Sequence, residues 1–83
     1  MDAYYITFRS VTHAQRGERV LKDAGLKCSL RRTPRWMEEQ GCGYCIGLRG
    51  EVSRARELLE ANEVPLRRIY RKGKDGRMEP WES

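Results

Sequence analysis

Two hydrophobic periodicities alternate along this chain, and their order constrains the fold more than any other feature. In some segments apolar residues recur at every second position, as in a half-buried strand, and in others they follow the spacing of an amphipathic helix. The strand-like runs are 3–9, 26–33, 42–49 and 66–71, and the helical runs are 10–24 and 53–63. Thr12 and Ser53 are the predicted N-caps of the helices, and Gly25 closes the first one.

The order strand, helix, strand, strand, helix, strand contains two β-α-β units. Right-handed crossovers place the helices of two such units on the same side of one sheet. We therefore expect an α+β fold, a ferredoxin-like βαββαβ split sandwich with a four-stranded antiparallel sheet and two helices on one face. Residues 1–72 form the single domain in this prediction, and residues 73–83 form a polar C-terminal tail. A hairpin turn at Asp75-Gly76 is the alternative to a frayed tail.

Size and charge limit the functions that this chain can have. With 83 residues it has room for one thin core and not for a deep active-site cavity, so we expect a carrier or adaptor rather than a turnover enzyme. Lys and Arg exceed Asp and Glu by 17 to 12, a net charge of +5, which favours acidic partners. The sequence lacks both a signal-peptide pattern and a run of about 20 apolar residues. These features predict a cytoplasmic protein that does not contact membranes.

Cysteine carries the most plausible chemistry. Three cysteines in a reducing compartment argue against a disulfide framework. Cys42 lies between Gly41 and Gly43, which leaves its thiol sterically open. Arg35 in the preceding loop, and Arg49 as a second candidate, could lower the pKa of this thiol and so favour the reactive thiolate. A small buried residue at the start of a strand is the alternative reading of Cys42, and both stay open at this point.

Two other cysteine sites are less favoured. Cys42 and Cys45 have C-x-x-C spacing, but residues three apart in a strand point to opposite faces, which disfavours a thioredoxin-type dithiol. Cys28, Cys42, Cys45 and His13 could supply a zinc site, yet they contain only one closely spaced pair. We therefore expect no metal and no cofactor, although a metal shared between two copies of the chain stays open.

A binding module for nucleic acid or an acidic protein is the alternative function. The predicted element order is also that of the RNA-recognition motif. Residues 42–49 match the signature of that motif only at Gly43 and Tyr44, so nucleic acid is not the favoured partner. The basic residues that could bind phosphates, or form solvated rows on strands, are Arg31, Arg32, Arg67, Arg68 and Arg71.

Four short motifs resemble the selenium/sulfur carrier protein-like family of small bacterial domains. They are Tyr-Tyr-Ile-Thr-Phe-Arg-Ser at 4–10, Leu-Lys-Asp-Ala-Gly-Leu at 21–26, Thr-Pro-Arg at 33–35 and Cys-Gly at 42–43. The order and spacing of these short motifs carry the resemblance. It covers roughly residues 4–71.

The resemblance implies a carrier of sulfur or selenium. It implies that one cysteine holds a persulfide or selenopersulfide and passes it on. Cys42 matches that cysteine and Gly43 the residue after it, while Thr33, Pro34 and Arg35 match the turn before the loop. The cargo would be a covalent group on Cys42 rather than a bound cofactor.

Cys45 departs from the family pattern, which usually has a small residue at this position. It could act as a resolving thiol, or simply replace an alanine. The partners implied by the resemblance are sulfur or selenium donor and acceptor proteins. A homodimer stays open, because the predicted sheet has one uncovered face.

Overall fold

The computed structural model describes residues 3–33 and 43–81 of the chain. It confirms the α+β class, with two helices and a five-stranded antiparallel sheet. The elements are β1 (Ala3–Thr7), α1 (Val11–Asp23), β2 (Cys28–Arg32), β3 (Tyr44–Arg49), α2 (Val52–Ala61), β4 (Arg68–Lys72) and β5 (Met78–Pro80). In the described ranges, neither helix has the length and apolar character needed to cross a membrane.

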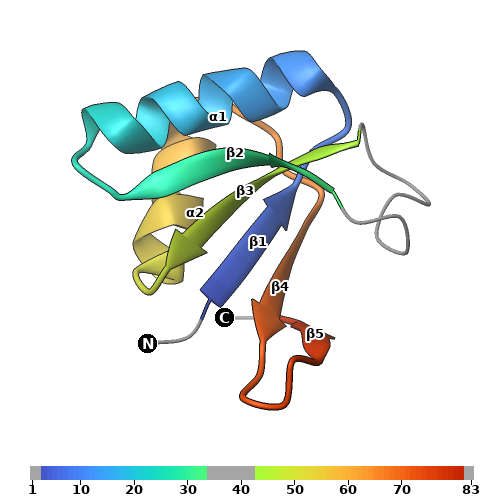
Figure 1. Cartoon of the computed structure of the whole chain (residues 1–83). Coiled ribbons are helices and arrows are strands. Elements are labelled where there is room, and N and C mark those ends of the chain that lie inside the picture. Colours follow the sequence, from blue (N-terminus) through green and yellow to red (C-terminus); the bar gives the residue numbers. More distant parts are fainter. Residues whose placement is uncertain (1–2, 34–42, 82–83) are drawn as a thin grey trace.

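The sheet has the strand order β2-β3-β1-β4-β5, and every neighbouring pair is antiparallel (Figure 1). The expected four-stranded sheet is therefore wrong, because β5 returns along β4 as a hairpin. Gly76 enables the turn with a φ of 83°, a value that glycine adopts without steric cost. The N–H of Gly73 donates to the carbonyl of Arg77 at 2.7 Å. The expected frayed tail is replaced by the hairpin alternative.

Both helices pack against the same face of the sheet (Figure 1). Gly17 lies where α1 crosses this face: a Cβ at that position would lie 3.0 Å from Phe8 Cζ, 3.1 Å from Ile46 Cδ1 and 3.2 Å from Leu59 Cδ2. These side chains come from the sheet side of the core and from α2. The absence of a side chain at Gly17 therefore lets α1 approach both layers closely.

Both helices begin at residues other than the predicted N-caps. Ser10 caps α1, and its side chain accepts a hydrogen bond from the N–H of His13 at 3.2 Å, so the prediction of Thr12 is wrong. Helix α2 begins after Glu51, whose backbone is left-handed with φ of 50° and whose side chain makes no capping hydrogen bond. Ser53 lies inside α2, so that predicted cap is wrong as well.

Alternate strand residues point away from the helices, to a face of the sheet that we call the outer face. Its residues follow from the register of the strands and from the burial of their neighbours in the core. On β1 to β4 they are Ala3, Tyr5, Thr7, Ser29, Arg31, Cys45, Gly47, Arg49, Arg68, Tyr70 and Lys72. Neither helix covers this face (Figure 1).

Candidate functional site

Thr33 and Gly43 bring the two ends of segment 34–42 together. The N–H of Thr33 donates to the carbonyl of Gly43 at 2.8 Å, which continues the β2–β3 ladder past the pair Arg32 and Tyr44. Thr33 is only 4% exposed, and Gly43 has a φ of 84°. A residue with a Cβ would be strained in that conformation. The glycine after Cys42 is therefore favoured by the conformation of the backbone at position 43.

The predicted carrier residues fall into three groups. Cys42, Pro34 and Arg35 lie outside the described residues. Thr33 and Gly43 are joined by the backbone hydrogen bond given above, and their roles beside Cys42 stay a prediction. Arg49 lies at the opposite end of β3, paired with Ala3. Arg49 lies six positions after Gly43 in extended chain, roughly 20 Å along the strand.

Arg32 is a cation that the site prediction did not include. Its guanidinium carbon lies 5.8 Å from the centroid of the Tyr44 ring, a distance at which a cation and an aromatic ring attract each other. Arg32 and Tyr44 are register partners at the Gly43 end of the β2–β3 ladder. The sequence contained one signal for Arg32, since it immediately precedes the Thr-Pro-Arg motif at 33–35.

Cys45 lies on the outer face but is hidden from solvent. Its exposed fraction is 1%, and its register partner Thr7 is 4% exposed. A thiol buried to this extent reacts with another protein only if the surrounding structure opens. The resolving role of Cys45 stays a prediction.

Cys28 faces the core from β2, opposite Leu48. Its thiol lies 3.9 Å from the backbone carbonyl of Glu18 on α1. Burial raises the pKa of Cys28 above the ordinary value, and the Glu18 carboxylate adds to the increase, whereas Lys22 partly offsets it. Cys28 is therefore less able than an exposed thiol to form the nucleophilic thiolate.

Cys28 and Cys45 point to opposite faces of the sheet, because one belongs to the core and the other to the outer face. They cannot act on one reactant together without a change of structure. In the part of the chain that the structure describes, no three His, Cys, Asp or Glu side chains are grouped so that they could hold a metal.

Comparisons with known proteins connect this geometry to a family. The family described as "Putative Se/S carrier protein-like" matches residues 3–71. Searches of curated proteins and of solved structures gave no match. The matched range includes Thr33, the whole segment 34–42 and Gly43. Because the match covers most of the chain, from Ala3 to Arg71, the chain belongs to the Se/S carrier protein-like family.

Proposed function

We propose that this chain accepts a sulfur or selenium atom on the thiol of Cys42 and passes it to an acceptor protein. Membership of the carrier-like family is the observation that supports the proposal most strongly. The residue pattern adds to it, since Cys42 is a thiol between two glycines and directly precedes the anchored Gly43.

The proposed transfer is a nucleophilic exchange that needs no external oxidant or reductant. The Cys42 thiolate attacks the outer sulfur of a donor persulfide. A sulfur–sulfur bond forms to Cys42 while the sulfur–sulfur bond of the donor breaks, and the donor leaves as a thiolate. A donor with a sulfur–selenium bond would leave selenium on Cys42 by the same exchange. A nucleophile of the acceptor then takes the outer atom and releases the Cys42 thiolate.

Nearby cations would favour the thiolate form of Cys42. Arg35 and Arg32 are the cations we assign to this role, and Arg32 precedes Thr33 at the anchored end of segment 34–42. Arg49 receives no role, because it lies at the other end of β3. A positive charge near a cysteine lowers the pKa of the thiol and increases the fraction that reacts at neutral pH.

We also propose that β1 to β4 and the two helices form a ferredoxin-like split sandwich, to which β5 is an addition. The order β2-β3-β1-β4 within the sheet supports this arrangement. In it the segment between β2 and β3 connects two neighbouring antiparallel strands. A carrier thiol on such a connection could enter the active site of a donor or acceptor while the sheet stays intact.

The test is sulfur transfer from a cysteine desulfurase. Reduced protein is incubated with the desulfurase and cysteine, and the intact mass and the modified peptide are measured. We expect a mass gain of one sulfur atom on Cys42 and no gain in Cys42→Ser. Cys28→Ser and Cys45→Ser are matched controls that should still accept sulfur. Equal sulfur acceptance by Cys42→Ser and the unmodified chain would disprove the carrier role.

A further inference from the structure

We propose that the outer face binds single-stranded nucleic acid around Tyr5, Gly47 and Arg49. This inference does not depend on the proposed carrier function. It concerns the end of β3 that lies away from Gly43, and it uses side chains of β1 to β4.

A hollow of about 450 Å³ opens on this part of the outer face. Among the residues that line it are Tyr5, Lys27, Arg31, Gly47 and Arg49. A Cβ on Gly47 would lie 3.3 Å from Arg31 Cδ and Nε and 3.5 Å from Tyr5 Cε1. The glycine therefore lets an arginine and a tyrosine from the two flanking strands converge over the centre of the sheet.

The charge of the outer face is entirely positive in the described strands. The exposed charged residues there are Arg31, Arg49, Arg68 and Lys72. Glu79 is the acidic residue of the described strands. It is the register partner of Arg71 and therefore lies on the face that the helices cover.

These four cations form no ion pair with any described acidic residue. Elsewhere on the surface, basic side chains pair with acids, as Lys22 does with Glu18 at 3.4 Å and Arg56 with Glu60 at 3.0 Å. Arg31 instead donates to the Ser29 hydroxyl at 3.1 Å. The outer face thus presents positive charge that is complementary to a polyanion.

Aromatic rings distinguish a nucleic acid from an acidic peptide as the occupant. Tyr5 and Tyr70 are direct register partners on β1 and β4, so both project from the outer face side by side. Both are half-buried. Unpaired bases stack on such rings while cations contact the phosphates, and this combination is typical of single-strand binding. Bases of a duplex are not available for this stacking.

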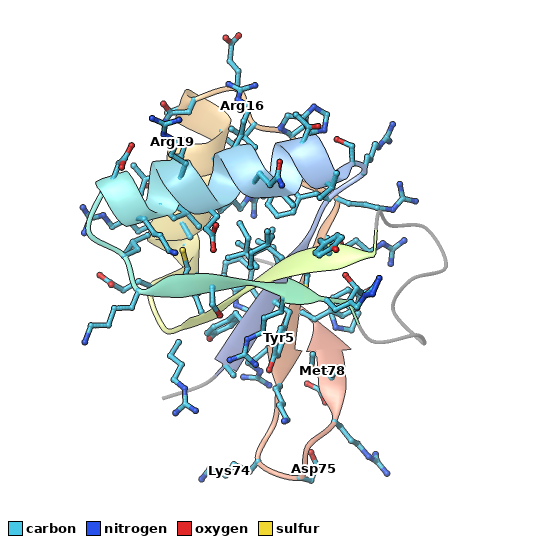
Figure 2. All side chains as sticks on the ribbon, turned by 45° about the horizontal axis from the view of Figure 1, so that its top comes forward. Tyr5, Arg16, Arg19, Lys74, Asp75 and Met78 are labelled. Carbon is cyan, nitrogen blue, oxygen red and sulfur yellow. The ribbon has the colours of Figure 1, made fainter. Side chains whose placement is uncertain are left out.

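Binding is measured by fluorescence anisotropy with a labelled, unstructured RNA of about 12 nucleotides, a length within the range of small single-strand binding domains. The charge test compares Arg31→Ala/Arg49→Ala with Arg16→Ala/Arg19→Ala. Arg16 and Arg19 project from the side of α1 away from the sheet, whereas Tyr5 lies below it (Figure 2). Each double variant loses two positive charges, so the two variants have the same net charge.

We expect the outer-face variant to reduce the slope of log K against log salt concentration by about 1.4, because each phosphate contact with a single strand contributes about 0.7. The α1 variant should keep the slope of the unmodified protein. Equal slopes in the two variants would overturn the proposal, since they would mean that net charge rather than this face determines binding. Circular dichroism and the urea midpoint confirm that both variants are folded.

The stacking test compares Tyr5→Leu with Tyr5→Phe. Leucine keeps an apolar side chain without an aromatic ring, so we expect about 5- to 150-fold weaker binding, the effect of one lost base stack. Phenylalanine keeps the ring and should bind like tyrosine. Equal affinities of the two variants, equal affinity for a duplex of the same length, or equally tight binding of a poly-glutamate peptide would each overturn the proposal, and the last would identify an acidic protein as the partner.

Discussion

At the scale of single residues, the two described thiols, Cys28 and Cys45, lie on different faces of the sheet. Cys28 is the one for which the structure gives a pKa direction, and its pKa is raised chiefly by burial. Above the ordinary pKa of 9.0, the thiol of the unfolded chain loses its proton while the folded chain retains it. The stabilisation associated with the neutral thiol is therefore complete below pH 9.0 and is lost as the pH rises through the folded pKa.

Replacement of Cys28 by alanine tests this pH dependence. We expect the difference in unfolding free energy between the unmodified protein and Cys28→Ala to be constant below pH 9.0 and to shrink above it. Urea unfolding at a series of pH values measures the difference. Cys45→Ala is the control for loss of a thiol on the other face of the sheet. A difference that stays constant or grows at high pH would contradict the raised pKa of Cys28.

At the scale of elements, the contact between α1 and the sheet depends on Gly17. Alanine at this position favours the helix by about 1 kcal/mol, but its Cβ would crowd Phe8, Ile46 and Leu59 at 3.0–3.2 Å. Overpacking of a core costs about 1–3 kcal/mol. We expect Gly17→Ala to lower the unfolding free energy by about 1 kcal/mol in urea titrations, because the crowding outweighs the gain in helix propensity.

Two further variants separate crowding from helix propensity. Gln15→Ala changes an exposed residue of α1 and should alter stability by less than about 0.5 kcal/mol. Ile46→Val removes the Cδ1 atom that a Cβ at Gly17 would approach to 3.1 Å. Gly17→Ala combined with Ile46→Val should therefore cost less than the sum of the two single changes. Strict additivity would exclude crowding as the cause.

Periodicity predicted the two helices and four of the strands, because each buries one face over several residues. The helix starts were less predictable. Thr12 and Ser53 have the side chains of good caps, but Ser10 caps α1, and α2 begins after Glu51 in a left-handed conformation. Capping depends on where tertiary packing ends the preceding strand, and a local residue pattern does not contain that information.

At the scale of the whole molecule, β5 and the residue after it complete the core. The rings of Trp81 and Tyr4 meet edge to face, with centroids 6.0 Å apart, and the N–H of Trp81 donates to the carbonyl of Ile69 at 2.8 Å. Both β5 and Trp81 lie beyond the range matched by the family. A strand of three residues carries too few positions for a period to be recognised, so the sequence predicted a tail there.

Trp81→Ala tests whether this extension stabilises the domain. We expect the unfolding free energy to fall by about 1–3 kcal/mol, less than the roughly 3–5 kcal/mol of a fully buried tryptophan, because Trp81 is only half-buried. Glu79→Ala is the control, since its ion pair with Arg71 is exposed on both sides and should contribute less than about 1 kcal/mol. Equal small effects of both variants would mean that the extension is dispensable for stability.

The two candidate sites differ in how far the sequence could predict them. The Cys42-Gly43 motif is local, so the pattern of the chain is enough to select it. The outer face joins Tyr5, Arg31 and Gly47, which are distant in sequence and become neighbours only through the strand register. The local signal for the outer face was Gly47, because a glycine inside a strand often marks a position that other groups approach closely.

The two outermost strands of the sheet, β2 and β5, are both protected against pairing with a further strand. The carboxylate of Glu18 accepts a hydrogen bond from the N–H of Leu30 at 2.8 Å, and β2 is an outermost strand. A foreign strand adding to this border would find that donor already occupied by a charged group. At the opposite border, β5 is short and ends at Pro80, which has no N–H to offer. The sheet is thus built to resist strand-by-strand aggregation at both borders, which leaves its face, rather than its edges, for contact with other molecules.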